Sequence, residues 1–345
     1  MKRDDFVSKP EKIEIFATDF PFGDLGWEKK MLKERKIAGN IRSSWCDKPG
    51  DVIEKAAGAD ALLVHHTPIT AEVIDELDNL KVIGRYGAGY DVIDLEAATT
   101  AGIAVINDPT YCIEEVTSHA LALMLTLIRR ISALDRLIKE GEWQSKEGFR
   151  AAGDIHRLQG QKLGLIGLGR IGQRLAVKAN ALGLKILTWD RRAEEKLAKK
   201  SELRRIKPLS LWELLEQSDI ISLHLPLTAK TEGLIGREEF EHMKKEAILI
   251  NTARGSLIEE KALVKALQKE KIAGAGLDVF REEPLPENHS LLNLPVEIEK
   301  RIILTPHAAF YSEEAESELR RNIMDQVLTV LEGEKPPHLV NPRVW

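Results

Sequence analysis

The sequence of 345 residues contains little cysteine and no excess of positive charge. Its two cysteines, Cys46 and Cys112, are too few for a disulfide framework, and neither has the spacing of a zinc site. Fifty lysines and arginines against 55 aspartates and glutamates leave a net charge of −5, whereas nucleic-acid-binding proteins usually concentrate positive charge. We therefore expect no disulfide-rich fold, no metal site and no nucleic-acid partner.

Long apolar runs are also absent. No stretch reaches the roughly 20 residues that a membrane-spanning helix needs, and the N-terminal MKRDDFVSKPEK lacks the apolar segment of a signal peptide. The sequence thus predicts a cytoplasmic protein without a membrane partner. Its length, at roughly 150 residues per domain, predicts two domains.

Short runs rich in β-branched residues alternate with amphipathic segments along nearly the whole chain. The first series predicts strands at 13–18, 61–65, 81–84 and 103–107, with helices at 27–35, 51–57, 71–77 and 95–100. The second predicts strands at 162–166, 185–188, 220–224, 247–251, 275–279 and 302–305, with helices at 170–181, 211–215, 238–243, 259–268 and 313–331. Such alternation indicates βαβ units, and therefore an α/β protein with parallel sheets.

One predicted helix, 120–128 with the sequence ALALMLTLI, is apolar nearly all round. A helix of this kind is buried on every side, either in a large core or against a second subunit. The residues by themselves leave both possibilities open.

A phosphate-binding turn is predicted at KLGLIGLGRIG, where a strand runs into Gly167, Gly169 and Gly172. The first glycine permits the tight turn, the second lets the backbone approach a pyrophosphate, and the third allows close helix–strand packing. The next predicted strand ends at Asp190, where an acid binds the adenosine ribose hydroxyls. We expect NAD as cofactor. Arg191 and Arg192 keep NADP as the alternative, because an arginine beside the acid can accommodate a 2′-phosphate.

Three further motifs follow later strands, at the sheet edge where open α/β sheets bind ligands. They are NTARG at 251–255, GLDVFREEP at 276–284 and TPHAA at 305–309. With GLGRIG, in this order, they make the sequence resemble the D-isomer-specific 2-hydroxyacid dehydrogenases over nearly the whole chain. The resemblance implies a Rossmann NAD-binding domain at 112–307, inserted into a flavodoxin-like substrate domain formed by 1–111 and 308–345.

The resemblance also implies that Arg254, Glu283 and His307 are the catalytic residues. A guanidinium can grip the carboxylate of a 2-oxo acid and polarise its ketone. An imidazole can transfer a proton near neutral pH, and a carboxylate on its other nitrogen fixes the tautomer. These residue types therefore suit interconversion of a 2-oxo acid and its (R)-2-hydroxy acid.

Cofactor contacts are implied in the same way, at the pyrophosphate, the ribose and the nicotinamide. The implied residues are Arg170 and Ile171 at the turn, His224, Pro226 and Thr231 over the ribose and phosphates, and Thr252, Ala253 and Asp278 near the nicotinamide. For Asp278, a strand-end cap is the alternative.

The segment RYGAGYD at 85–91 is similar to the substrate loop of the family, with Arg85, Tyr86, Gly87 and Ala88 as the implied residues. Backbone N–H groups of such a loop can bind a carboxylate, although a turn capping the following helix is also possible. The loop resembles that of the C-terminal-binding-protein corepressors and their bacterial dehydrogenase relatives.

This branch implies two more substrate contacts. Phe310 would pack on the side chain of the substrate, at a position where the corepressors carry tryptophan. His66 would line the same pocket, unless it lies in a solvated loop.

The resemblance further implies a homodimer formed through the helix at 120–128. Two other functions stay open from the residues alone: an NADH-sensing interaction protein of the corepressor kind, and an oxidase of phosphonate or formate.

Overall fold

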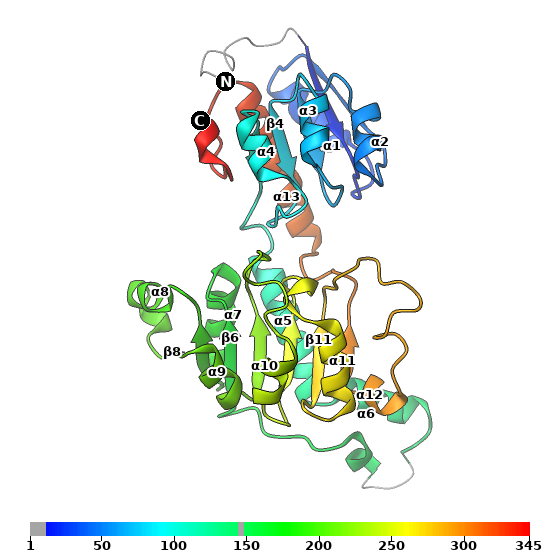
Figure 1. Ribbon diagram of the computed structural model, residues 1–345, viewed down its shortest axis with the longest axis vertical. Helices are drawn as coiled ribbons and strands as arrows, with labels where there is room; N and C mark the ends of the chain where they lie inside the picture. The colour runs from blue at the N-terminus through cyan, green and yellow to red at the C-terminus, as the bar shows by residue number, and fades with distance from the viewer. Residues whose placement is uncertain (1–11, 144–147) are drawn as a thin grey trace. The chain divides into compact units, whose positions relative to one another are not determined.

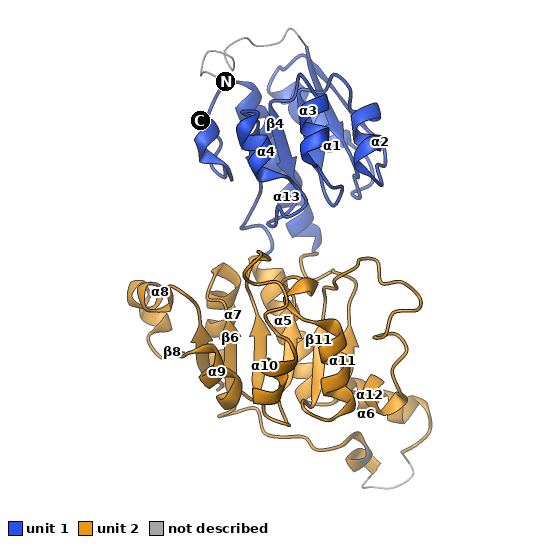
Figure 2. Cartoon of the chain, in the orientation of Figure 1, with its two compact units in different colours: residues 1–112, 312–345 blue, residues 113–311 orange. Residues whose placement is uncertain are grey.

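The computed structural model describes residues 12–143 and 148–345. The chain forms two compact units, one of residues 1–112 and 312–345 and the other of residues 113–311 (Figure 2). The sequence predicted the two crossings after residues 111 and 307, and the contacts place them after Cys112 and Tyr311.

The first unit is built on a five-stranded parallel sheet with the order β2-β1-β3-β4-β5. Its strands are β1 Ile13–Ala17, β2 Gly39–Ser43, β3 Ala61–Val64, β4 Val82–Arg85 and β5 Ala104–Ile106. This order is that of flavodoxin-like folds. The sequence did not predict β2, because the edge strand GNIRS buries only Ile41 and so lacks an apolar run.

Helices cover both faces of this sheet, and the last of them comes from the far end of the chain. They are α1 Gly26–Glu34, α2 Pro49–Lys55, α3 Ala71–Glu76, α4 Leu95–Thr100 and α13 Glu313–Leu331. Helix α13, orange in Figure 1, packs against β4. Gly84 permits this approach, because an added Cβ would lie 2.7 Å from Val327 Cγ2. A buried ion pair, Arg320 Nε to Glu28 Oε1 at 2.9 Å, joins α13 to α1.

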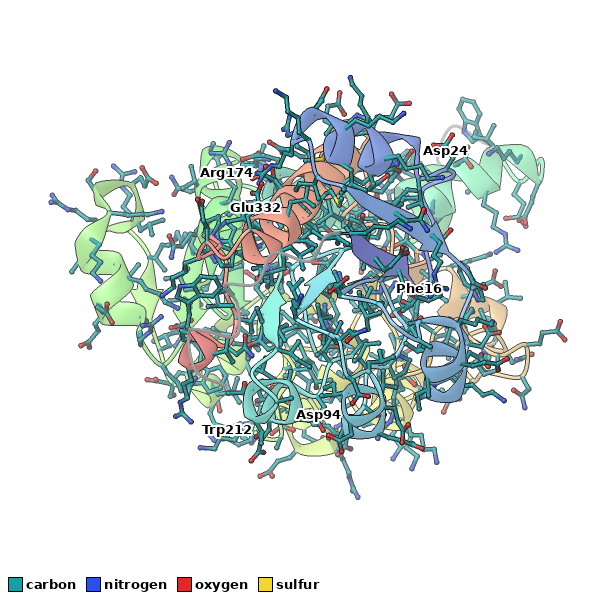
Figure 3. The ribbon with its side chains drawn as sticks, turned by 90° about the horizontal axis from the view of Figure 1, so that it is seen from above. Phe16, Asp24, Asp94, Arg174, Trp212 and Glu332 are labelled. Atoms are coloured by element: carbon teal, nitrogen blue, oxygen red, sulfur yellow. The ribbon has the colours of Figure 1, made fainter. Side chains whose placement is uncertain are left out.

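In this unit, apolar and polar side chains occupy different places, in the core and at the surface. In Figure 3, Phe16 lies on β1 and is 1% exposed, whereas Asp24 stands at the surface. Asp94 precedes α4, and its carboxylate accepts a hydrogen bond of 2.9 Å from the backbone N–H of Ala97. The polar residue thus caps the helix while the apolar one fills the core.

The second unit contains a seven-stranded parallel sheet with the order β12-β11-β10-β9-β6-β7-β8. Its strands are β6 Lys162–Ile166, β7 Lys185–Trp189, β8 Lys207–Pro208, β9 Ile220–Leu223, β10 Ile248–Asn251, β11 Gly274–Leu277 and β12 Ile302–Leu304. The strand order reverses between β6 and β9, as in dinucleotide-binding folds. The two parallel sheets confirm the predicted fold class. Only the two-residue edge strand β8 was not predicted.

Helices lie on both faces of the second sheet. They are α5 Ile113–Ile128, α6 Ile131–Lys139, α7 Arg170–Ala181, α8 Ala193–Lys199, α9 Leu211–Gln217, α10 Arg237–His242, α11 Glu260–Gln268 and α12 Val296–Glu299. Helices α5 and α7 share one core cluster with the sheet, and α9, α10 and α11 share another on the opposite face (Figure 1). In the described part of the chain, no helix combines the length and apolarity needed to cross a membrane.

The apolar segment within α5 is buried on one face. Leu123, Met124 and Leu127 are buried against the sheet, whereas Leu121 and Leu125 are only partly covered. The helix is therefore not enclosed on every side by its own chain.

The contact between β4 and α13 predicts that Gly84→Ala destabilises the protein. The new methyl group would overpack a complete core, which typically lowers the free energy of unfolding by about 1–3 kcal/mol. Denaturant unfolding of the full chain measures the change. Gly50→Ala is the matched control, because an added Cβ there meets nothing within 4 Å, and we expect no loss of stability. A Gly84→Ala variant as stable as the wild type would refute this view of the packing.

Candidate active site

The predicted cofactor and catalytic residues of the second unit follow the carboxyl ends of its strands. The turn at Gly167 follows β6, Asp190 follows β7 and His224 follows β9. Thr252 follows β10, and His307 follows β12. Because all these strands are parallel, the residues share one edge of the sheet, which includes the point where the strand order reverses.

The three glycines of the turn have different surroundings. Gly167 has φ +102°, and an added Cβ would lie 2.5 Å from the carbonyl oxygen of His224. A Cβ on Gly172 would lie 2.4 Å from the carbonyl oxygen of Gly167. At Gly169 an added Cβ meets nothing within 4 Å, so the fold of the chain itself does not require glycine there. The open space at Gly169 is where the motif places a pyrophosphate.

Helix α7 begins directly after this turn, with Arg170 and Ile171 in its first turn. Gly169 is the N-cap residue and has no side chain to accept hydrogen bonds from the first N–H groups. These groups and the helix dipole together suit an anion. The residues present therefore fit the pyrophosphate of a dinucleotide.

Asp190 ties the end of β7 to the glycine turn. Its Oδ2 accepts a hydrogen bond of 2.9 Å from the N–H of Leu168, and its Oδ1 accepts one of 2.8 Å from the N–H of Arg192. Lys196 donates to the same carboxylate at 2.6 Å. Burial raises the pKa of Asp190, but the hydrogen bonds from Lys196, Leu168 and Arg192 outweigh it and hold the pKa below its ordinary value. Asp190 is therefore ionised at neutral pH.

His224, Pro226 and Thr231 shape the loop after β9. His224 Nε2 lies 2.9 Å from Ser222 Oγ, and burial lowers the pKa of His224 to about 4, so the ring is neutral. Thr231 Oγ1 donates to the carbonyl of Pro226 and accepts from the N–H of Thr228, each at 2.8 Å. These bonds close the loop beside Gly167.

The loop after β10 is fixed by Asn251. Its Nδ2 donates to the carbonyl of Arg254 at 2.9 Å, and its Oδ1 accepts from the N–H of Ala253 at 3.0 Å. Within this loop, the buried hydroxyl Oγ1 of Thr252 has no hydrogen-bond partner among the described residues. A buried polar group left in this state costs about 1–3 kcal/mol. A bound polar ligand would supply the missing partner, and the contact of Thr252 with the nicotinamide stays a prediction.

Gly255 brings this loop against the next one. An added Cβ would lie 1.9 Å from the carbonyl carbon of Phe280, so no other residue fits. Arg254 Nη1 donates to the carbonyl of Ala253 at 2.7 Å, which orients the guanidinium. The cation is thus held next to the segment that carries Glu283.

His307 and Glu283 form a direct pair. His307 Nδ1 lies 2.6 Å from Glu283 Oε2, and both side chains are 29% exposed, so the pair is accessible to a ligand. Glu283 Oε1 accepts a hydrogen bond of 2.8 Å from the N–H of Phe280. The carboxylate is therefore fixed by the backbone while it holds the imidazole.

The backbone of His307 has φ +50°, which is unusual for a residue with a side chain. Asp278 stabilises this conformation from both sides. Its carbonyl accepts the N–H of His307 at 2.7 Å, and its carboxylate accepts the N–H groups of Ala308 and Ala309, each at 2.9 Å. Thr305 Oγ1 donates to the same carboxylate at 2.6 Å. Asp278 thus has the contacts of a strand-end cap, which was the alternative to its predicted nicotinamide contact.

His119 belongs to the same cluster, although the sequence analysis predicts no role for it. Its Nε2 lies 3.0 Å from Thr305 Oγ1 and 3.6 Å from Asp278 Oδ1. The one signal in the sequence is a histidine at the start of a strongly apolar helical segment.

The predicted substrate residues are divided between the units. Phe310 lies in the second unit, with its ring 6.2 Å from that of His307 and nearly perpendicular to it. Arg85 is the last residue of β4 in the first unit, and Tyr86, Gly87 and Ala88 follow it. His66 follows β3, is exposed, and has its ring 4.1 Å from that of His65.

In the loop after β4, Arg85 is buried and donates through Nη1 to the carbonyl of Tyr86. Its guanidinium lies across Gly87, where φ is +145° and an added Cβ would be 1.3 Å from Arg85 Nη1. The Tyr86 side chain is 1% exposed, and its hydroxyl lies 3.4 Å from Glu28 Oε1. Tyr86 is therefore a core residue whose backbone alone lies in the loop. The carbonyl of Ala88 accepts from Asn107 Nδ2 at 2.6 Å.

The loop after β3 depends on Asp19, another residue that the sequence did not reveal. Its carboxylate accepts the backbone N–H groups of His65 at 2.8 Å, Thr67 at 2.9 Å, and His66 between them. Asp19 thus sets the position of His66.

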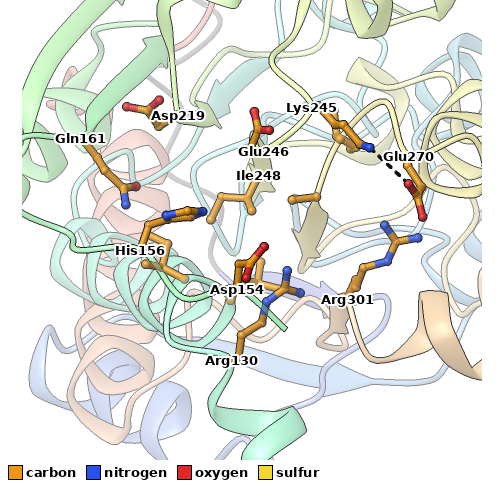
Figure 4. A pocket seen from close by; sticks show the side chains of 14 residues that line it. Arg130, Asp154, His156, Gln161, Asp219, Lys245, Glu246, Ile248, Glu270 and Arg301 are labelled. Carbon is orange, nitrogen blue, oxygen red and sulfur yellow. Dashed lines mark ion pairs between the residues drawn. The ribbon is translucent and has the colours of Figure 1, made fainter. Parts of the chain in front are cut away.

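A pocket of about 400 Å³ lies elsewhere, at the amino ends of the strands of the second sheet (Figure 4). Charges of both signs line it, including Arg130, Asp154, Glu246 and Arg301, and the Lys245–Glu270 ion pair of 3.4 Å lies at its edge. None of the predicted site residues lines it. The predicted cofactor and catalytic residues of this unit lie at the opposite edge of the sheet, at the carboxyl ends of its strands.

Comparison with known proteins identifies the family of the chain. Residues 121–309 match the family described as D-isomer specific 2-hydroxyacid dehydrogenase, NAD binding domain. The chain is 39% identical over 295 residues to a glyoxylate reductase of Korarchaeum cryptofilum, which covers 85% of this chain and 86% of that protein.

Solved structures extend the likeness over both units. A D-lactate dehydrogenase of Aquifex aeolicus, complexed with NAD and lactic acid, has a TM-score of 0.83 and 29% identity, covering 95% of this chain and 99% of that one. An acyclic imino acid reductase in complex with NADPH and D-Arg has a TM-score of 0.82 and 29% identity, covering 95% and 100%. The chain belongs to the D-isomer specific 2-hydroxyacid dehydrogenases and is an oxidoreductase whose NAD-binding domain is the second unit.

Proposed function

We propose that this protein reduces a small 2-oxo acid, such as glyoxylate or hydroxypyruvate, to the (R)-2-hydroxy acid with NADH. The observation that carries the proposal is the 2.6 Å pair of His307 and Glu283 beside the loop of Arg254. This pair lies at the same sheet edge as the glycine turn. The glyoxylate reductase and D-lactate dehydrogenase among its relatives support a substrate of this class.

The histidine supplies the proton. Glu283 accepts the hydrogen of Nδ1, which directs the proton of Nε2 toward the substrate. When bound, NADH supplies the hydride that attacks the carbonyl carbon. The carbonyl oxygen then takes the proton from His307, so that the product is an alcohol and the imidazole is left neutral.

Arg254 supplies the fixed positive charge. A guanidinium held by the Ala253 carbonyl can grip the substrate carboxylate and polarise the ketone while negative charge develops on the oxygen. This stabilisation needs no movement at the moment of reaction, because the Asn251 side chain already fixes the loop.

The cofactor would be held at three points of the second unit. The pyrophosphate would lie over Gly169 and the first turn of α7, and the adenosine ribose beside Asp190. The nicotinamide would lie near Thr252 and Ala253. Arg85 and the backbone of 86–88 in the first unit would bind the substrate carboxylate. His66 of the same unit and Phe310 of the second unit would contact the substrate side chain.

We also propose that the protein is a homodimer through the uncovered side of α5. Ile131 and Ile138 of the next helix are 52% and 54% exposed, and Leu121 and Leu125 of α5 are only partly covered. The complete pair of His307 and Glu283 favours turnover over a corepressor-like sensor.

Replacement of the proton donor tests the reaction. In His307→Gln, we expect kcat/KM for glyoxylate or hydroxypyruvate to fall by about 10²–10⁴, the usual contribution of a general acid. NADH affinity should be retained. NADH consumption with each 2-oxo acid measures the rate, and a fluorescence titration measures cofactor binding.

His242→Gln is the matched control, because His242 also pairs with a glutamate, at 3.2 Å from Glu216, on the surface. It should keep full activity. Full activity of His307→Gln, or no NADH consumption by the wild type with any 2-oxo acid, would contradict the proposed function.

The buried hydroxyl of Thr252 gives a second prediction. In Thr252→Val the protein loses no internal hydrogen bond, so the free energy of unfolding without cofactor should not fall. NADH should bind about 3- to 10-fold more weakly, because one hydrogen bond contributes about 0.5–1.5 kcal/mol. Calorimetric titration and thermal unfolding measure the two effects.

Thr188→Val is the control, and its expected effect on stability is the opposite of that of Thr252→Val. Thr188 is also fully buried, but its hydroxyl donates to the carbonyl of Leu165 at 3.1 Å. This variant should lose stability. If Thr252→Val is the less stable of the two and binds NADH normally, the hydroxyl serves the fold and not the cofactor.

A further inference from the structure

We propose that Lys196 is a cofactor-specificity residue: its ion pair with Asp190 opens the adenosine ribose site to NADPH as well as NADH. This inference rests on the proposed function and deepens it, since it concerns the cofactor of the same site. It depends on three features of the second unit: the ion pair, the cations beside it, and the bonds that keep Asp190 in place.

The ion pair neutralises the residue that would otherwise reject NADPH. An acid at the end of the second strand accepts the ribose hydroxyls of NADH and repels the 2′-phosphate of NADPH by its charge. Here Lys196 Nζ lies 2.6 Å from Asp190 Oδ2, and the two side chains are only 19% and 10% exposed. A partly buried pair is weakly screened by salt, so the ammonium cancels much of the field that a phosphate would meet.

Further cations lie beside the pair. A hollow of about 560 Å³ is lined by Asp190, Arg191 and Arg192, and also by Ser210 and Glu213. The side chains of Arg191 and Arg192 are exposed and make no hydrogen bond or ion pair with any described residue. They are therefore available to a phosphate group in this hollow.

Three glutamates line the hollow, Glu194, Glu195 and Glu213, and two of them are already engaged. Glu195 pairs with Lys199 at 2.5 Å, and Glu213 accepts from the hydroxyl of Ser210 at 2.7 Å and from its N–H at 3.0 Å. Their negative charge is partly compensated within the chain, so the two arginines face less opposition than the number of acids indicates.

Asp190 does not need Lys196 to stay in place. The N–H groups of Leu168 and Arg192 hold its two oxygens independently of the lysine. Lysine has a long flexible stem and three donors, so its ammonium can turn from the carboxylate to a 2′-phosphate. With NADH, the same carboxylate can accept the ribose hydroxyls. One site therefore suits both cofactors.

Separate titrations of the full-length protein with NADH and NADPH test this inference by binding alone. For the wild type, we expect the two dissociation constants to lie within about tenfold of each other. In Lys196→Met, which keeps the length of the stem and removes the charge, the ratio of the NADPH to the NADH constant should rise about tenfold, equivalent to about 1.4 kcal/mol. NADH affinity should change much less.

Two variants serve as controls. Lys196→Arg keeps the charge and should keep the ratio of the wild type. Lys199→Met removes a lysine from the same helix whose partner is Glu195, and it should also leave the ratio unchanged. Circular dichroism and thermal unfolding confirm that each variant is folded.

The inference is overturned if the wild type binds NADPH more than about a hundredfold more weakly than NADH, a result that needs no variant. It is also overturned if Lys196→Met weakens both cofactors equally, because Lys196 would then only support the fold of the turn. In both cases NADH still binds and the proposed function stands. Failure of the wild type to bind either cofactor would overturn both proposals.

Discussion

The candidate active site at the edge of the second sheet depends on the carboxylate of Asp278. It is fully buried, and it accepts the N–H groups of Ala308 and Ala309 and the hydroxyl of Thr305. A charge in this position is stable only because these donors replace water. In return the loop holds His307 at φ +50°, from which its ring meets Glu283. Without that anchor, the backbone of a histidine would relax toward negative φ and move the ring.

Carboxylates also accept backbone N–H groups at other strand ends. Asp190 holds the N–H of Leu168 in the glycine turn, Asp19 holds the N–H groups at 65–67, and Glu283 holds the N–H of Phe280. Loops after parallel strands have no neighbouring strand to pair with, so their backbone donors need other acceptors. Carboxylates supply them and also leave charge at the edge where ligands bind. The shape and the electrostatics of the site therefore have a common origin.

Local patterns predicted most of the fold, because a buried strand or an amphipathic helix shows in its own residues. The strands β2 and β8 were missed because edge strands need no apolar run. The glycine turn and the pair of His307 and Glu283 came from motifs. Asp19, His119 and Lys196 could not be found in this way. Asp19 and His119 have partners that are distant in sequence. Lys196 is near Asp190 in sequence, but no motif marks the pair, and only the folded chain shows their contact.

At some positions, contacts within the chain explain the residue that is present, and at others they do not. This difference separates residues needed for folding from residues needed for function. Gly167, Gly172 and Gly255 are required by contacts within the protein, since any side chain there would collide with its backbone. Gly169 is required by nothing within the described chain, and the buried hydroxyl of Thr252 has no partner there. Folding alone gives no advantage to a glycine with open space around it or to a hydroxyl without a partner. The proposed dinucleotide would account for both positions, because it would lie over the glycine and accept or donate a hydrogen bond at the hydroxyl.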